Sequence, residues 1–243
     1  MELNKPETEN KPKIEKLYFK AFRAVDNRQD CMRFIEGHTH VLEVFGITQI
    51  TSAKIDWVLN PDVYVVLVSE HENGPALGGG RIHVANRKNP LPIEDAVGAM
   101  DASIYKMVED DTDAGTGEFC ALWNSWEIAG MGIGSIYLGR IFIALAHRLG
   151  LKTLYGLCAP ATYRNSLRVG FRVLQEIGIN GKFYYPKEQL TATSLIIEDL
   201  QNLPLAVEEE REEIFKLRHE KSYTTMISTL KNENIELHTD FNI

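Results

Sequence analysis

Two kinds of residues that can do chemistry stand close together in the middle of the sequence. Gly130, Gly132 and Gly134 alternate within five positions, directly before an apolar run with helical spacing. Glycines at the start of a helix let an anion approach the backbone N–H donors, to which the helix macrodipole adds about half a positive charge. Upstream, Glu118 and Glu127 supply carboxylates that burial can turn into general bases. The segment combines a candidate anion site with candidate proton acceptors.

Two common phosphate-binding motifs do not fit these glycines. A P-loop ends in Gly-Lys-Ser/Thr, whereas Gly134 is followed by Ser135 and Ile136. The dinucleotide fingerprint Gly-x-Gly-x-x-Gly needs its third glycine at Ser135 or Tyr137, and the next strand ends without an acidic residue. The sequence therefore argues against a nucleotide-hydrolysing P-loop and a Rossmann site. A tight strand-to-helix turn without a ligand remains the alternative.

The pattern of apolar residues predicts a mixed α/β fold, whose strands and helices must position these residues. Apolar runs of period two or of continuous character predict strands, and 3.6-residue periodicity predicts helices. The expected strands are 17–25, 63–71, 76–85, 118–128, 153–159 and one or two within 181–200. The expected helices are 28–46, 95–111, 135–149, a short one around 161–169 and one or two within 205–230. We expect a central sheet of about six to seven strands flanked by helices.

The chain divides into three parts by composition. Residues 1–15 are polar and predict a disordered leader, and residues 16–200 contain the expected sheet and its helices. Residues 201–243 are rich in acidic residues and predict a helical extension. Its charged helices are a possible surface for a homodimer.

Two motifs together resemble those of the GCN5-related N-acetyltransferase superfamily. The segment 129–135 (AGMGIGS), followed by a helix, Gly-Leu-Lys and a strand, resembles the pyrophosphate-binding pattern Gln/Arg-x-x-Gly-x-Gly/Ala, with Gly132 and Gly134 at the small positions. Further on, APATYRNSLRVGF resembles the next motif of the superfamily, a short helix that ends in Gly-Phe, here Gly170 and Phe171. The resemblance covers residues 17 to 200, and the expected order of elements agrees with it.

The resemblance implies an acyltransferase that uses acetyl-CoA or another acyl-CoA as co-substrate and the amine of a small molecule or peptide as acceptor. Successive backbone N–H groups would face the pyrophosphate, and glycines would let its oxygens approach. The implied cofactor-binding residues are Ile128, Met131, Gly132, Ile133, Gly134 and Ser135.

The sequence departs from the superfamily pattern at two positions. Ala129 stands where Arg or Gln is usual, which removes one side-chain contact to the pyrophosphate. Ser166 stands where a Tyr often protonates the departing thiolate, and its hydroxyl is a poor acid near neutral pH. Tyr163, one helical turn earlier, is either a substitute acid or a packing residue.

The general base has two candidates on the expected strand before the glycines. Strand parity places Glu118 on one face with Cys120, and Glu127 on the other face with Trp123 if no bulge intervenes. Either carboxylate can serve as the base, or neither. Trp123 is expected to pack in the core or to form a wall of the acyl or acceptor pocket.

Three functions remain open at this point. A plain N-acetyltransferase is the main interpretation. The segment 78–92 (GGGRIHVANRKNPLP) also looks somewhat like the autoinducer synthases, which transfer longer acyl groups, although their N-terminal Arg/Phe/Trp pattern is missing. The third is a catalytically impaired protein that binds acyl-CoA as a sensor, because two positions are off-pattern.

Composition and charge indicate which classes of partner are disfavoured and which cell compartment to expect. A net charge of −8 argues against a nucleic-acid surface, which needs clustered Lys and Arg. No segment approaches the roughly 20 apolar residues of a membrane span. Three distant cysteines without a Cys-x-x-Cys pair are typical of reduced thiols, so we expect a soluble cytoplasmic protein. His38 and His40 lack a third ligand nearby, so we expect no metal site there.

Overall fold

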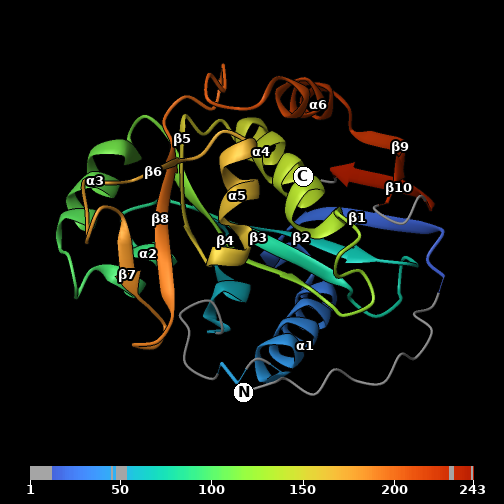
Figure 1. Ribbon diagram of the computed structural model, residues 1–243, viewed down its shortest axis with the longest axis horizontal. Coiled ribbons are helices and arrows are strands. Elements are labelled where there is room, and N and C mark those ends of the chain that lie inside the picture. Colours follow the sequence, from blue (N-terminus) through green and yellow to red (C-terminus); the bar gives the residue numbers. More distant parts are fainter. Residues whose placement is uncertain (1–12, 45, 48–53, 230–232, 242) are drawn as a thin grey trace.

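A single mixed sheet runs through the computed structural model, which describes residues 13–44, 46–47, 54–229, 233–241 and 243 (Figure 1). The strands of the described residues are β1 (Lys16–Arg23), β2 (Val63–Ser69), β3 (Gly78–Val84), β4 (Thr116–Asn124), β5 (Thr153–Cys158), β6 (Arg172–Val173), β7 (Lys182–Tyr184), β8 (Thr191–Ile197), β9 (Ser222–Ser228) and β10 (Asn234–Phe241). Their order across the sheet is β6-β8-β5-β4-β3-β2-β1-β10-β9, and β7 pairs with β8.

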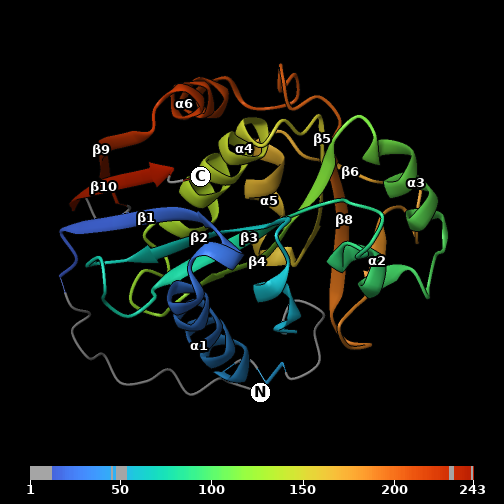
Figure 2. The same ribbon diagram turned by 180° about the vertical axis from the view of Figure 1, so that it is seen from behind.

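Helices cover both faces of this sheet, as Figures 1 and 2 show from opposite sides. The α-helices of the described residues are α1 (Arg28–Val44), α2 (Pro92–Val97), α3 (Ser103–Thr112), α4 (Leu138–Arg148), α5 (Pro160–Arg168) and α6 (Glu208–His219). Short helical turns are η1 (Ala24–Asp26), η3 (Asp56–Leu59) and η4 (Ile133–Tyr137). Helices α4, α5 and α6 lie on one face, and α1, α2 and α3 lie on the other.

Alternation along the strands builds an apolar core on each side of the sheet. Ile82 of β3 and Phe119 of β4 face α4, where the Phe119 ring stacks on Phe142 with centroids 4.2 Å apart. The opposite face carries two apolar clusters. One cluster includes Phe34 of α1, and the other includes Ile93 of α2. The face with α1 and α2 therefore has a boundary between two clusters, and it runs along β3 and β4.

Several sequence expectations are confirmed and several are corrected. The mixed α/β class is right. Asn27 caps α1, because its Oδ1 accepts the Asp30 N–H at 3.0 Å. The sheet has more strands than the six to seven expected, because the extension contributes β9 and β10 and the two-residue strand β6 follows α5. The expected helix at 95–111 is two helices, α2 and α3, separated near Gly98.

The extension at 201–243 is only partly helical. Helix α6 ends at His219, and β9 and β10 replace the helix expected as far as residue 230. The run Ser-Tyr-Thr-Thr-Met-Ile-Ser is rich in β-branched residues, and its tertiary pairing overrides helix formation. Strand β10 adds to the sheet by parallel pairing with β1. The extension therefore completes the sheet of the main domain.

The last residues of the leader expected at 1–15 are part of the folded structure. Residues 1–12 lie outside the described residues, but Ile14 is only 4% exposed and belongs to the core beneath α4. None of the helices that the structure describes has the length and apolar character needed to cross a bilayer.

One buried carboxylate of α6 joins this helix to both α4 and α5. Glu210, 1% exposed, accepts a hydrogen bond from Arg140 Nε of α4 at 2.6 Å and another from Arg168 Nη2 of α5 at 2.8 Å. Burial works against ionisation, but both guanidinium groups together hold the pKa of Glu210 below its usual value. This carboxylate fixes α4, α5 and α6 relative to one another.

Glu210→Gln is expected to lower the free energy of unfolding by about 1–3 kcal/mol at pH 7, because the neutral amide keeps only one acceptor oxygen for the two partly exposed arginines. A depressed pKa gives stability above the unfolded pKa, so the deficit should disappear as the pH falls through the folded pKa. Urea titrations between pH 3 and 7 measure this. Glu213→Gln, which removes an exposed ion pair with Lys216, is the matched control with an expected change below about 0.5 kcal/mol. Equal effects of both changes would contradict the anchoring role.

Candidate functional site

Strands β4 and β5 are paired at one end and unpaired at the other. Their parallel register runs from Thr116↔Thr153 to Phe119↔Gly156 and stops there, although β4 continues to Asn124 and β5 to Cys158. On their outer sides both strands remain bonded, β4 to β3 and β5 to β8. The backbone groups of β4 and β5 that face each other beyond Phe119 are thus left without a ladder between the two strands.

A bulge in β4 accompanies this separation. The register with β3 shifts between Arg81↔Cys120 and Gly79↔Trp123, and Ala121 has a φ of +51°. An extra residue in one strand bends it and increases its twist, which directs the end of β4 away from β5. The parity argument from the sequence assumed no bulge, so it does not hold beyond Cys120.

The glycine turn lies at the open end of these strands. Gly130 and Gly132 have φ of +80° and +78°, a region that favours glycine. A Cβ built on either residue would meet nothing within 4 Å, so this side of the turn is open. Gly134 is different, because its Cβ would collide with the Asn124 side chain at the end of β4. The first two glycines thus leave one side of the turn open, and the third lets the turn pack against β4.

The turn leads into a continuous helical segment formed by η4 and α4. Its first N–H groups have no partners inside the helix, and the aligned dipole favours an anion at this end. The expected helix start at Ser135 is thus a π-type turn from Ile133, with the α-helix proper from Leu138. The segment is fixed in the core, since Ile133 and Leu138 are fully buried.

The cofactor-binding residues predicted from the sequence lie together at this turn. They differ in how far each is exposed to solvent. Gly132 is exposed, and Met131 is partly exposed while packing on the core under α4. Ile128 is 1% exposed and Ile133 is buried, so any contact of these two with a ligand is through the backbone. The side chain of Ser135 lies outside the described part of the structure.

Glu118 lies near the point where β4 and β5 separate. It is 2% exposed, and its Oε2 accepts the backbone N–H of Ile93 at 2.6 Å, at the start of α2. Burial raises its pKa to about 8, and the hydrogen bond and the charge of Arg81 offset this in part. A carboxylate with such a pKa can accept a proton near neutral pH.

Glu127 is placed differently from Glu118. Strand β4 ends at Asn124, so Glu127 lies in the turn between the strand and the glycines, where it is half-buried. The expected strand at 118–128 is thus too long by four residues. The two carboxylates are therefore not on one strand, and Glu118 faces the α1 and α2 side of the sheet.

Tyr163 and Ser166 lie on α5, which follows the open end of β5. Tyr163 is half-buried and packs against the core beneath α4. The Ser166 hydroxyl donates a hydrogen bond to the Thr162 carbonyl at 3.1 Å, one turn earlier in the same helix. Its proton is therefore engaged within the helix, and Tyr163 is the better candidate for an acid.

Sequence reasoning missed a group of polar side chains beside Glu118. Arg81 is 1% exposed, and its guanidinium lies over the Trp57 ring at 4.4 Å. His83 is opposite Glu118 in the β3–β4 register and is 8% exposed. Trp123 follows the bulge on the same face and contacts Phe34 and His38. We call Arg81, His83, Glu118 and Trp123 the Arg81 cluster.

A signal for this cluster is present in the sequence. Arg81 is the lone charge in the strand ALGGGRIHVA, and His83 follows two residues later on the same face. A charged residue inside a strand with small and apolar neighbours on both sides is rarely buried without a specific reason. The strand expected at 76–85 was assigned no functional side chain from the sequence.

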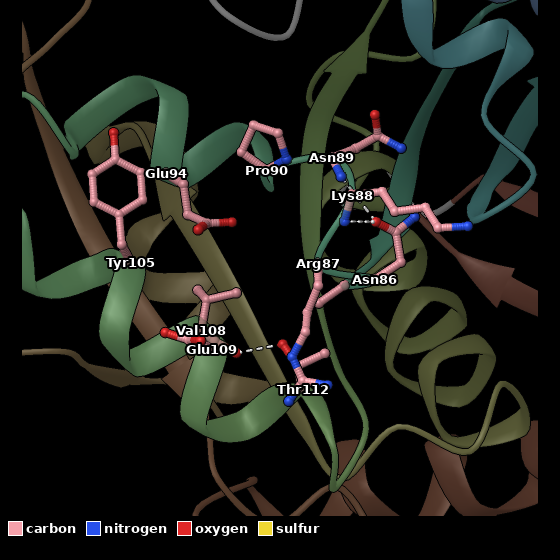
Figure 3. Close-up of a pocket in the computed structure, with 11 residues that line it drawn as sticks. Asn86, Arg87, Lys88, Asn89, Pro90, Glu94, Tyr105, Val108, Glu109 and Thr112 are labelled. Atoms are coloured by element: carbon pink, nitrogen blue, oxygen red, sulfur yellow. Dashed lines mark hydrogen bonds between the residues drawn. The ribbon is translucent and has the colours of Figure 1, made fainter.

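A cavity of about 480 Å³ lies elsewhere, between the loop after β3 and helix α3 (Figure 3). Glu94 and Tyr105 belong to its walls, with Arg87 and Lys88 on the loop side. The Ala85 N–H donates to the Thr116 carbonyl, so the cavity lies at the start of β4. The glycine turn lies at the other end of β4, and this cavity is therefore separate from the open end of β4 and β5.

Comparison with known proteins gives structural likeness at low sequence identity. No protein-family model matches the sequence, and no curated protein sequence is significantly similar to it. FeeM, an N-acyl amino acid synthase from uncultured soil microbes, superposes with a TM-score of 0.57 at 12% identity, covering 79% of this chain and 95% of its own.

Two further structures give similar results. The CoA-dependent acyl-homoserine lactone synthase MesI gives a TM-score of 0.50 at 12% identity, over 82% of this chain and 94% of its own. ElaA of Escherichia coli gives 0.52 at 10% identity, over 75% and 99%. At these identities the likeness concerns the fold, and the fold implied by the GCN5-related N-acetyltransferase resemblance is confirmed.

Proposed function

We propose that the chain is an acyl-CoA-dependent N-acyltransferase that transfers an acyl group from coenzyme A to the amine of a small molecule. The observation that supports it most is one of placement. Strand β4 carries the buried Glu118, separates from β5 beyond Phe119 and leads into the open glycine turn. FeeM and MesI, which share the fold, are described as an N-acyl amino acid synthase and a CoA-dependent acyl-homoserine lactone synthase.

Coenzyme A fits the turn by its chemistry. Its pyrophosphate is a compact dianion, and the open backbone at Gly130 and Gly132 leads into the N-terminus of a long helical segment. Its pantetheine arm carries two amides, which match the backbone groups left without a ladder between β4 and β5. The proposed ligand-binding residues are Ile128, Met131, Gly132, Ile133, Gly134 and Ser135, with backbone donors taking the place of the side chain that Ala129 lacks.

The reaction is an acyl transfer without a covalent enzyme intermediate. The neutral amine attacks the thioester carbonyl carbon, a C–N bond forms, and the C–S bond breaks with its electron pair on sulfur. The proton that the nitrogen loses passes to the Glu118 carboxylate, and the thiolate takes a proton for which Tyr163 is the candidate donor. Glu118 and Tyr163 are thus proposed as base and acid, and Glu127 and Ser166 are not assigned a step.

The same chemistry serves an acetyl group or a longer acyl group. The autoinducer-synthase-like alternative is compatible with the fold that the chain shares with the acyl-homoserine lactone synthase MesI. We place the protein in the cytoplasm, in keeping with three buried free cysteines.

Calorimetric titration of Gly132 variants with acetyl-CoA, decanoyl-CoA and free CoA tests the proposal. Gly132→Glu and Gly132→Gln carry the same strain at positive φ and fill the same open space, but only the first adds a negative charge. We expect the Glu variant to bind CoA at least about tenfold more weakly than the Gln variant, because its carboxylate repels the pyrophosphate. Equal affinities of the two variants, or no binding by the unaltered protein, would remove the support for the proposal.

A further inference from the structure

The Arg81 cluster occupies the boundary between the two apolar clusters on the face of α1 and α2. Arg81 pairs with Cys120 across the strands and His83 pairs with Glu118, so these side chains share one face. Cys120 is the residue directly after the last β4–β5 pair, Phe119↔Gly156. The cluster therefore lies beside the open strand end, on the face opposite α4.

Arg81 supplies the positive charge of the cluster, and the carboxylates of Glu94 and Asp95 on α2 act on Glu118 from outside it. Burial raises the pKa of Glu118 to about 8, so this carboxyl is mostly protonated at neutral pH. Burial together with the charge of Arg81 holds the pKa of His83 well below its usual value, so the imidazole is neutral. Such an interior is suited to a bound anion, and a bound cation is disfavoured.

Two buried nitrogen atoms of the cluster indicate which groups a ligand must offer. Trp123 Nε1 and His83 Nε2 are buried without a hydrogen-bond partner among the described residues, and these side chains are 4% and 8% exposed. An indole N–H can only donate, and a neutral imidazole can donate from Nε2. A buried donor without a partner is unfavourable by about 1–3 kcal/mol. Because the indole N–H of Trp123 can only donate, the group that satisfies it must be an acceptor.

We infer that the Arg81 cluster binds the carboxylate of an amine acceptor, so that the substrate class is that of free amino acids or other amines with a nearby carboxylate. A carboxylate is acceptor-only and can take hydrogen bonds from a guanidinium and an indole. Arg81 and Trp123, which carry these groups, both contact the Phe34 ring. Held there, the carboxylate places the amine of the same molecule close to Glu118 and to the open end of β4. This assignment rests on the proposed function and specifies its acceptor.

The acceptor reaches the cluster between η3 and α2. Trp57 of η3 covers Arg81, and the first turn of α2 covers Glu118 through the Ile93 N–H. An exposed ion pair between Lys54 and Asp95, 2.8 Å long, joins the two covering segments. Exposed pairs of this kind contribute roughly 0–1 kcal/mol, so their separation opposes entry only weakly.

The test compares L-amino acids with their α-carboxamides as acceptors, using acetyl-CoA and decanoyl-CoA as donors. Each pair has the same side chain and amine but differs in the anion. We expect the unaltered protein to favour the carboxylate about 100-fold in kcat/KM. Arg81→Gln should reduce this preference to near unity, and Trp123→Phe, which removes only the N–H and retains an aromatic ring, should reduce it about tenfold. The KM for the acyl-CoA should not change in either variant.

The outcomes separate this inference from the proposed function. Acylation of carboxamides as fast as of amino acids, or of neither while acyl-CoA still binds, overturns the carboxylate site but not the binding of acyl-CoA. A variant Arg81→Gln that keeps the full preference also overturns it. If Arg81→Gln fails to fold by circular dichroism, an unchanged preference in Trp123→Phe decides against the inference. Absence of acyl-CoA binding in the unaltered protein contradicts the proposed function itself.

Discussion

Glu118→Gln is expected to lower kcat for amine acylation by about 1000-fold while leaving the affinity for acyl-CoA unchanged. General base catalysis contributes roughly 10²–10⁴-fold, and the amide cannot accept the proton. The amide oxygen can still accept the Ile93 N–H that now bonds to Oε2, so α2 should stay in place. Steady-state kinetics with saturating acyl-CoA, together with calorimetry of CoA binding, measures both quantities.

The pH dependence distinguishes a base from a residue that only packs. With the pKa of Glu118 raised to about 8, kcat of the unaltered protein should rise with pH up to that value and then level off. The acceptor amine also titrates, but it does so equally in Glu118→Gln, so the difference between the two profiles isolates Glu118. Glu127→Gln is the control and should leave the profile unchanged. A Glu118→Gln enzyme of near-normal kcat would exclude Glu118 as the base.

The same substitution has an opposite effect on stability. The folded pKa of Glu118 lies above the unfolded value of 4.5, so the folded state binds more protons than the unfolded state between pH 4.5 and about 8. The unaltered protein therefore loses stability across this window, and Glu118→Gln does not. By linkage the variant should be more stable by roughly 3–5 kcal/mol at pH 9 and equal below pH 4.5. An active site that retains an unfavourable buried carboxyl fits a trade of stability for function.

Gly79→Ala is expected to destabilise the protein by about 4 kcal/mol or more, the largest destabilisation that we predict. Gly79 has a φ of +156°, and a Cβ on it would lie 2.3 Å from the Val66 carbonyl oxygen and 3.0 Å from the Phe34 ring. The carbonyl belongs to the neighbouring central strand and cannot move without breaking the sheet. Gly80 serves the other face, where Phe142 and Phe119 approach. These adjacent glycines let aromatic rings pack against the backbone from both sides.

Urea unfolding measures the change, with Gly74→Ala as control. A Cβ on Gly74, in the turn before β3, meets nothing closer than 3.4 Å, so we expect a change within about 0.5 kcal/mol. If Gly79→Ala still folds, we also expect weaker acylation, because the bulge opposite Gly79 positions Trp123. A free energy of unfolding equal to that of the control would show that β3 tolerates a side chain at this position.

The sequence by itself determined the fold class, the order of the main elements and the glycine turn. Periodicity and turn residues are local properties, so α1, β2 and β3 lie close to where the pattern predicted them. The glycines at 130, 132 and 134 were informative for the same reason, since a positive φ and a crowded approach to Asn124 both require glycine. The spacing of these glycines before a helix is therefore enough to predict an anion site.

Only the tertiary structure decided the rest of the site. The bulge at Ala121 and the separation of β4 from β5 depend on pairing between distant strands, which strand parity cannot foresee. The environment of Glu118 depends on α2, which covers it from 25 residues upstream and removes it from water. Likewise Arg81 and Trp123 are brought together with Phe34 of α1 by the sheet order. The raised pKa of Glu118 and the buried Trp123 N–H without a hydrogen-bond partner among the described residues both result from burial and long-range contacts. Neither can be read from a local segment.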